Sequence, residues 1–272
     1  MTAARFRAIL AGDACLRPAS VANPLSMRAA AEIGYELAML AGSVAALEIL
    51  GAPDLALITL TELAEQVHRV ARAAPLPLLV DGDHGYGNAL SVRRTAIELA
   101  AAGAAAVTIE DTDLPASGPG RLLPIATAAA KVRAGVEAGA DIVVVGRTNA
   151  ALVVDRADLL ARQRAFEEAG AEAIFFAGIK TRDDLEAVAA HARKPLILSA
   201  MPADLTAADC APLGVRICLQ GHQPHFDAIG AHYRRLHLQR TGEEPADSDP
   251  RPLTKRLSGT EEHARWAKDY LG

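Results

Sequence analysis

Residues 76–110 of the chain read LPLLVDGDHGYGNALSVRRTAIELAAAGAAAVTIE, and this stretch decides the fold. It opens with a short apolar run (Leu76–Asp81), passes through a glycine-rich loop, and continues with helical apolar spacing over Ala89–Ala102. A second apolar run, Ala106–Glu110, follows. Apolar runs without alternation are typical of parallel strands covered on both faces, with a helix as the crossover. The stretch therefore predicts a strand–helix–strand unit.

The same unit repeats from Ala19 to about Leu238. Eight apolar runs predict strands at Ala19–Val21, Leu37–Leu40, Leu76–Asp81, Ala106–Glu110, Ile142–Arg147, Ala173–Phe176, Leu196–Leu198 and Val215–Leu219. Helices are expected at Pro24–Gly34, Leu60–Ala74, Ala89–Ala102, Ile125–Ala138, Asp155–Ala169, Arg182–Ala192 and Ala207–Leu213, and after His225. Glycines are expected to stop several of them, namely Gly34, Gly103, Gly139, Gly170 and Gly214. Eight units without a change of pattern favour an α/β fold closed into a (β/α)₈ barrel of the TIM type, and an open doubly wound sheet is the alternative.

The two ends of the chain differ from this repeat. Met1–Leu16 is expected to be a leading helix that packs on the barrel. Arg240–Pro252 is polar and rich in Pro, Asp and Glu, which is typical of an exposed linker, and Glu261–Leu271 returns to helical spacing. We therefore expect a catalytic barrel over residues 1–239. Over 240–272 we expect a linker and a helix that docks on its own barrel or on a neighbouring subunit.

The composition excludes several classes of protein. Hydrophobic residues make up 51% of the chain and aromatic residues 4%, which indicates a core of Ala, Leu, Val and Ile. A net charge of −5 and few aromatic residues argue against nucleic-acid binding. No apolar run is long enough for a membrane span, and no signal peptide is recognisable. The three cysteines lack CxxC spacing and are expected to be buried in a reducing compartment, so we expect a cytoplasmic protein.

Acidic side chains follow two neighbouring strands of the expected barrel. Asp81 and Asp83 lie at and just beyond the end of one strand, and Glu110 ends the next. The carboxyl ends of barrel strands meet at one rim, where the active sites of this fold are built. Carboxylates repel one another unless they are neutralised, and oxygen ligands suit a hard cation such as Mg²⁺ or Mn²⁺. The sequence predicts a metal site here, and a plain Asp-Gly turn is the alternative.

Other polar residues are expected on the same rim. Arg147 ends an apolar strand, so it must meet an anion, either a substrate carboxylate that suits its planar fork or one of the neighbouring acids. Gly42 and Ser43 follow the second strand and offer backbone N–H groups to an oxyanion, although a plain turn explains them as well. His222 follows the eighth strand. It could serve as an acid, a base or a hydrogen-bond donor to the substrate, and a solvated loop residue is the alternative.

The sequence shows no evident phosphate-binding loop. Barrels that hold phosphate commonly have glycine-rich loops after strands seven and eight, and here Ser199–Pro202 and Gln220–His222 contain a single glycine. A small dicarboxylate or keto acid therefore suits the site better than a sugar phosphate.

Several short motifs together resemble the isocitrate lyase/phosphoenolpyruvate mutase superfamily. They are Val80–Asn88 (VDGDHGYGN), Thr108–Asp111 (TIED), Arg147–Asn149 (RTN), Pro53-Asp54 and Ala41–Ser43. The resemblance covers nearly the whole chain, from Ser20-Val21 to the terminal WAKDYL. Within the superfamily, DHGYGN, APDLALITL (Ala52–Leu60) and Gly221-His222 are most similar to the bacterial oxaloacetate decarboxylase branch.

The resemblance implies a barrel whose helices are exchanged in a dimer inside a tetramer. It implies Mg²⁺ held by Asp83 directly, with Asp81 and Glu110 acting largely through water. The substrate-binding residues that it implies are Gly42, Ser43 and Arg147 at the 2-keto acid end, His222 at the distal end, and Asp54 in the Pro-Asp motif.

The chain departs from the superfamily pattern at three places. The Lys-Cys-Gly-His loop of isocitrate and methylisocitrate lyases is absent, since Asp113–Pro124 reads DLPASGPGRLLP, so the cysteine acid of a C–C lyase is lacking. A tyrosine after the seventh strand is missing, and the segment before Lys131 has no acidic residue.

We therefore expect a carbon–carbon lyase that decarboxylates oxaloacetate, or a close 2-keto diacid, to pyruvate and CO₂ with Mg²⁺. Arg147, His222 and Ser43 are the expected catalytic residues. One alternative is another superfamily lyase or mutase that acts on a substituted malate or a phosphonate. Another is a barrel that binds a keto acid without turnover.

Overall fold

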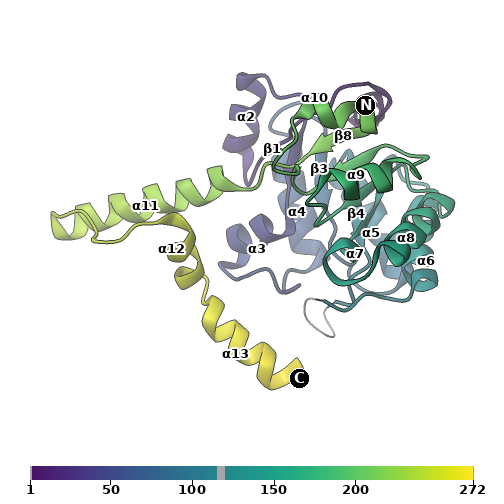
Figure 1. Ribbon diagram of the computed structural model, residues 1–272. Coiled ribbons are helices and arrows are strands. Elements are labelled where there is room, and N and C mark those ends of the chain that lie inside the picture. The colour runs from purple at the N-terminus through teal and green to yellow at the C-terminus, as the bar shows by residue number, and fades with distance from the viewer. Residues whose placement is uncertain (1, 115–119, 272) are drawn as a thin grey trace.

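The computed structural model describes residues 2–114 and 120–271. Its eight strands are β1 (Ala19–Ser20), β2 (Ala38–Leu40), β3 (Leu78–Asp81), β4 (Ala106–Glu110), β5 (Val143–Thr148), β6 (Ala173–Phe176), β7 (Leu196–Leu198) and β8 (Val215–Cys218). They are parallel and adjacent in chain order, and Figure 1 shows them enclosed by helices. The predicted TIM-type barrel is confirmed. The doubly wound alternative is wrong, because that fold would reverse the strand order partway.

The seam of the barrel lies between β8 and β1, and a residue ahead of β1 closes it. Leu16 donates its N–H to the carbonyl of Arg216 at 2.8 Å, and Cys218 donates to the carbonyl of Leu16 at 2.9 Å. The leading helix, α1 (Thr2–Ala11), is therefore shorter than the expected Met1–Leu16, because the end of that segment is drawn into the sheet.

Helices connect the strands and cover the outside of the barrel. They are α2 (Pro24–Ile33), α3 (Gly42–Leu50), α4 (Leu60–Ala71), α5 (Ala89–Ala102), α6 (Ile125–Val136), α7 (Ala150–Val153), α8 (Arg156–Glu168), α9 (Arg182–Ala189), α10 (Ala207–Cys210) with a 3₁₀ turn (Ala211–Leu213), and α11 (Gln223–Thr241). Every helix expected from the spacing is present. As predicted, left-handed glycines cap three helix ends, at Gly34, Gly103 and Gly214, while Gly139 and Gly170 have positive φ just beyond two further helices.

Helices α3 and α7 were not expected from the sequence. α3 begins directly after β2, and its N-cap residue, Ala41, makes no side-chain hydrogen bond to the helix. α7 is a single turn directly after β5, and its N-cap residue, Asn149, makes none either. The usual start signal, a side-chain cap, is thus absent from both.

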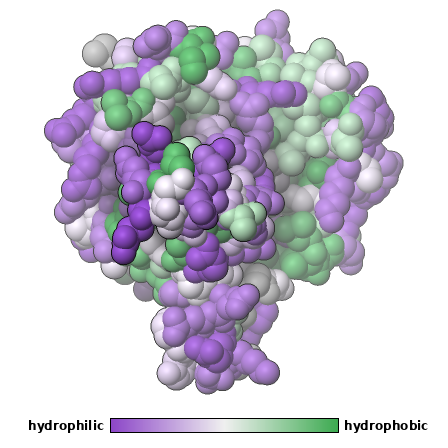
Figure 2. Space-filling view, turned by 90° about the vertical axis from the view of Figure 1, so that its left-hand side faces the viewer, coloured by the Kyte–Doolittle hydropathy of each residue, from purple (hydrophilic) through white to green (hydrophobic). Residues whose placement is uncertain are grey.

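The end of the chain forms an arm of three helices. α11 runs to Thr241 and α12 (Pro250–Leu257) begins at a proline, so the expected linker Arg240–Pro252 is wrong at both ends and only residues 242–249 join the helices. The final helix, α13 (Thr260–Leu271), is confirmed. Figure 1 shows α11 leading away from the barrel and α13 lying below it, and the tip of α11, nearest the viewer in Figure 2, is mainly hydrophilic.

The core is built from aliphatic side chains and alanine, as the composition predicts. Phe166 of α8 lies so close to Gly146 of β5 that a Cβ on this glycine would be 2.8 Å from the ring. Small residues thus allow the helices to approach the sheet closely. Cys15, Cys210 and Cys218 are free and buried, as expected. In the part of the chain that the structure describes, no helix has the length and apolarity to cross a membrane.

Candidate active site

The predicted acidic residues and Arg147 come together at the carboxyl ends of β3, β4 and β5. Nη1 of Arg147 donates to Asp81 at 2.7 Å, and Nη2 lies 2.9 Å from Oε2 of Glu110. Glu110 and Arg147 are direct neighbours in the parallel ladder, so the strand register itself places this pair. Of the two anions expected for Arg147, the neighbouring acids are the ones it contacts.

Asp81 is held as a carboxylate although it is buried. Its Oδ1 accepts hydrogen bonds from the hydroxyl of Thr108 at 2.9 Å and from the N–H of Asp83 at 3.3 Å. Burial raises the pKa of Asp81, but the Arg147 guanidinium and these bonds outweigh it and hold the pKa below its usual value.

Asp83 is held in an unusual backbone conformation. Its φ is +46°, in the left-handed region, and its carbonyl accepts the N–H of Glu110 at 2.9 Å. A Cβ placed on Gly42 would lie 2.6 Å from Oδ1 of Asp83, so the carboxylate occupies the space that a side chain at position 42 would need. Burial and the neighbouring charge of Asp81 raise the pKa of Asp83 well above its usual value. A carboxylate in this position needs a further cation.

The donor set fits a hard divalent cation. Asp54 adds a fourth carboxyl group, and burial followed by the charge of Asp81 raises its pKa to about 6. Four acids thus share a single guanidinium, and oxygen is their only ligating element. No three His, Cys, Asp or Glu side chains among residues 2–114 and 120–271 are grouped to hold a metal by themselves. Direct binding of the cation by Asp83, with Asp81 and Glu110 acting through water, stays a prediction.

A layer of polar residues behind the acids was not singled out from the sequence. The Asn149 side-chain amide donates to Glu110 at 3.2 Å and to Thr112 at 2.6 Å. Asn149 belongs to the RTN motif, so its place next to Arg147 was the available signal. It donates to Oε2 of Glu110, the same carboxylate oxygen that Arg147 contacts.

A second buried ion pair supports this layer. Asp111 is fully buried and accepts the Thr148 hydroxyl at 2.6 Å, the Asn149 N–H at 3.1 Å and Nη1 of Arg162 at 3.2 Å. Arg162 also donates to Asp158 at 2.5 Å. Arg162 lies within a helix, at a position where no motif marks a buried cation.

His222 and Ser43 lie beside this group rather than within it. Nδ1 of His222 is 2.8 Å from Oγ of Ser20, at the seam of the barrel. Burial lowers the pKa of His222, against the opposing charge of Asp81. Ser43 is half-buried in the first turn of α3, next to Gly42. Their expected roles stay predictions.

A cavity of about 820 Å³ opens above the acids. Its polar floor contains Asp54, Asp83, Glu110, Arg147 and Asn149. Its walls are largely apolar. Leu55, Leu57, Leu152 and Val153 belong to the barrel, whereas Trp266 and Tyr270 belong to the arm. Four of the predicted site residues thus line one cavity, while Asp81, Gly42, Ser43 and His222 do not line it.

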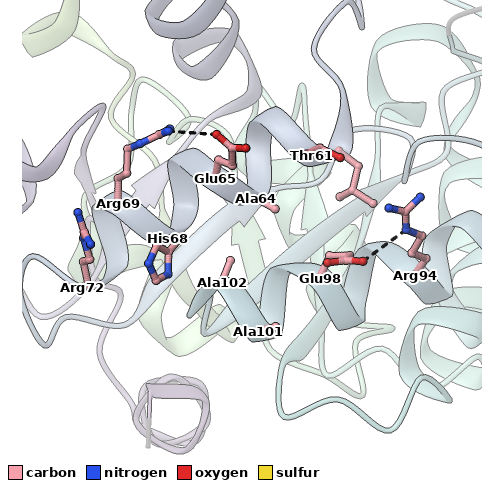
Figure 3. Close-up of a pocket in the computed structure, with 11 residues that line it drawn as sticks. Thr61, Ala64, Glu65, His68, Arg69, Arg72, Arg94, Glu98, Ala101 and Ala102 are labelled. Carbon is pink, nitrogen blue, oxygen red and sulfur yellow. Dashed lines mark hydrogen bonds and ion pairs between the residues drawn. The ribbon is translucent and has the colours of Figure 1, made fainter.

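A second cavity, of about 540 Å³, lies on the outside of the barrel between α4 and α5. Figure 3 shows two ion pairs along it, Arg69 with Glu65 and Arg94 with Glu98. None of the predicted site residues lines this groove.

Comparison with known proteins finds relatives that match most of the chain. The family model described as phosphoenolpyruvate phosphomutase matches residues 6–237. A Rhodopseudomonas palustris BisA53 protein named oxaloacetate decarboxylase is 49% identical, over 93% of this chain and 87% of its own. A Pseudomonas fluorescens Pf0-1 protein named oxaloacetate decarboxylase 1 is 44% identical, over 98% of this chain and 94% of its own.

Two solved structures are similar over the whole fold. One is 2,3-dimethylmalate lyase, a member of the PEP mutase/isocitrate lyase superfamily, with a TM-score of 0.80, 27% identity and 98% of each chain covered. The other is phosphonopyruvate hydrolase in complex with oxalate and Mg²⁺, with a TM-score of 0.79, 27% identity and 100% of each chain covered. The resemblance found in the motifs is thereby confirmed, and the chain belongs to the phosphoenolpyruvate phosphomutase family of this superfamily.

Proposed function

We propose that this chain decarboxylates oxaloacetate, or a close 2-keto diacid, to pyruvate and CO₂. The observation that carries the proposal is the buried group of acids around the single guanidinium of Arg147, at the floor of the cavity. Identity of 44–50% with curated relatives named oxaloacetate decarboxylase supports the choice of substrate.

The chemistry requires stabilisation of one oxygen. Loss of CO₂ from the carbon next to a ketone moves the bonding electron pair to the keto oxygen, which becomes an enolate oxygen. A bound Mg²⁺ or Mn²⁺, held by Asp83 directly and by Asp81 and Glu110 through water, would supply Lewis-acid stabilisation of that charge. The N–H groups of Gly42 and Ser43 act on the same oxygen, because the first N–H groups of a helix have no partner within the helix.

Arg147 and His222 complete the reaction. Arg147 binds the C1 carboxylate, an anion that suits its planar guanidinium, and its buried Nε–H has no hydrogen-bond partner among the described residues. Asp54 contributes to substrate binding from the cavity floor. His222 approaches the distal end of the substrate and donates the proton that converts the enolate to pyruvate. Cleavage of the C–C bond itself needs no protein base.

The test is CO₂ release from oxaloacetate with Mg²⁺, compared with the same reaction after EDTA treatment. Because free Mg²⁺ also chelates a 2-keto acid, a blank with metal and no protein is subtracted. We expect turnover that EDTA abolishes and that Asp83→Ala reduces to the blank. Glu65→Gln in the outer groove is the control and should keep full activity. Blank rates with the unmodified protein, or full activity of Asp83→Ala, would contradict the proposal.

A second function is favoured by one observation. The two solved structures at 27% identity act, by their names, on a substituted malate and on a phosphonate. A panel of oxaloacetate, its methylated homologues, methylisocitrate and phosphonopyruvate separates a decarboxylase from such a lyase or mutase. Binding of oxalate without turnover of any of them would indicate a keto-acid-binding barrel.

We also propose that the working protein is a cytoplasmic homo-oligomer, a dimer of dimers in which the C-terminal helices are exchanged. Helix α13 has no fully buried residue, and Tyr270 leaves 80% of its surface exposed, which supports docking on a second copy. The proposed division at residues 239 and 240 then separates the catalytic barrel from the segment that exchanges. Light scattering of the full chain and of a chain ending at residue 239 tests this point.

A further inference from the structure

Ser20 and His222 face each other across the seam of the barrel. Ser20 is the last residue of β1, and His222 follows β8 and precedes α11. Oγ of Ser20 lies 2.8 Å from Nδ1 of His222. Near the middle of these strands the seam is closed by backbone bonds of Leu16, and at the rim this side-chain bond joins the two sides.

This contact determines which ring nitrogen is available for chemistry. An imidazole has two nitrogens, and the partner of one decides what the other can do. Nδ1 is engaged by Ser20, so Nε2 is the nitrogen left to a ligand. A serine hydroxyl can accept from a protonated Nδ1 and donate to an unprotonated one by rotating its O–H. The proton donor is the imidazolium, which keeps its Nδ1–H when the proton leaves Nε2, so Nδ1 donates to Oγ of Ser20 and the ring is held before and after the transfer.

We propose that Ser20 is the positioning residue for His222, holding Nδ1 so that Nε2 is the nitrogen that transfers the proton. The role assigned to His222 rests on the proposed decarboxylation, whereas the contact with Ser20 does not. Proton transfer breaks the Nε2–H bond and forms a C–H bond on the methylene carbon of the enolate, and solvent returns the proton to Nε2. No other reactant is needed.

Other titratable and charged groups also face His222 and act on its ring, so the experiment must measure a property of Nδ1 itself. They come from β3, α11 and α12 and are Asp81, His225 and Arg251. His225 is held separately, with its Nδ1 at 3.9 Å from Glu48. Among the described residues, Nδ1 of His222 forms its hydrogen bond with Ser20 and with none of these three.

The first experiment measures the nitrogen chemical shifts of His222 in the full-length protein labelled with ¹⁵N-histidine. His222→Gln identifies its signals among the eight histidines. Ser20→Ala should shift the Nδ1 signal and its tautomer ratio, and Ser20→Thr, which keeps the hydroxyl, should restore both. Ser199→Ala, a serine at the end of the neighbouring strand β7, is the matched control and should leave the signals unchanged. An unaltered Nδ1 signal in Ser20→Ala would overturn the contact whether or not oxaloacetate is turned over.

The second experiment measures kcat and KM for oxaloacetate. Loss of one orienting hydrogen bond should lower kcat about 10-fold in Ser20→Ala, with KM within about twofold. In a His222→Gln background, Ser20→Ala should lower kcat no further, because Ser20 acts only through the imidazole ring of His222. A full additional loss in that background would assign Ser20 an independent role and overturn the proposal. Absence of turnover in the unmodified protein would count against the proposed function alone, since the nitrogen shifts test the contact separately.

Discussion

The arginine–carboxylate pairs at the rim of the barrel and those in its outer groove differ in burial. At the rim, Arg147 has 20% of its side chain exposed, and its partners Asp81 and Glu110 have 10% and 5%. In the outer groove of Figure 3, the side chains of the two pairs are 45–65% exposed. A buried charge loses its hydration and depends on its partners, whereas an exposed charge keeps water as an alternative. The same chemical pair is therefore essential in one place and nearly dispensable in the other.

Arg147→Ala should have the largest effect, because it leaves Asp81 and Glu110 buried without their cation. We expect the free energy of unfolding to fall by about 3–5 kcal/mol, the usual loss when one partner of a buried pair is removed. Decarboxylation should fall at least about 1,000-fold, since the charged contact proposed between Arg147 and the substrate carboxylate is also lost. Urea unfolding and CO₂ release measure the two effects.

Arg147→Lys is the informative companion to that variant. It restores a positive charge without the planar fork, so it should recover part of the stability but little of the activity. If Arg147→Ala unfolded at the same urea concentration as the unmodified protein, the contrast between the rim and the outer groove would be wrong.

Arg162→Ala should have the next largest effect, and mainly on stability. Its side chain and that of Asp111 are 5% and 0% exposed, so Asp111 would lose its only cation among the described contacts. We expect a loss of about 3 kcal/mol in unfolding free energy. Arg164→Ala, an exposed arginine in the same helix, is the control and should change it by less than about 0.5 kcal/mol. Equal effects of the two variants would contradict the assigned role of burial.

Gly42→Ala should affect the rim by a smaller amount. The new Cβ would meet Oδ1 of Asp83 at 2.6 Å, so either the carboxylate or the start of α3 must move. Overpacking of this kind costs about 1–3 kcal/mol. The sharper measurement is the rise in melting temperature on adding Mg²⁺, which should shrink because Asp83 is displaced. An undiminished Mg²⁺ effect would show that Asp83 does not need this space.

The sequence predicted the strands of the rim closely and the bonds between their side chains only in part. Asp81, Glu110 and Arg147 could be assigned to one rim because strand ends in a parallel barrel converge, which is a property of topology. The partner of Arg147 could not be chosen, because both a substrate and a neighbouring acid satisfy a cation at a strand end. That choice depends on register, which pairs Glu110 with Arg147 and is set by the whole sheet.

Helices without a local start signal were the main omission in the fold. α3 was missed because Ala41 makes no side-chain cap, and its place is fixed by packing on the barrel rather than by its own sequence. The support of the site by Arg162 was missed for a similar reason. A helical arginine usually faces solvent, and only the fold shows that this one reaches Asp111.

The outer groove gives the smallest expected effect and the cleanest test of the contrast. Glu98→Gln removes the charge that faces Arg94 at 3.4 Å, one helical turn away on α5. Exposed pairs of this spacing contribute about 0.3–0.5 kcal/mol, and salt screens them. We expect a difference of at most about 0.5 kcal/mol in unfolding free energy at low salt, vanishing near 1 M NaCl, where the Debye length is only about 3 Å. Activity should not change. A loss as large as that of Arg162→Ala, or one that persists in salt, would mean that the groove holds a buried, functional pair and that exposure does not separate the two regions.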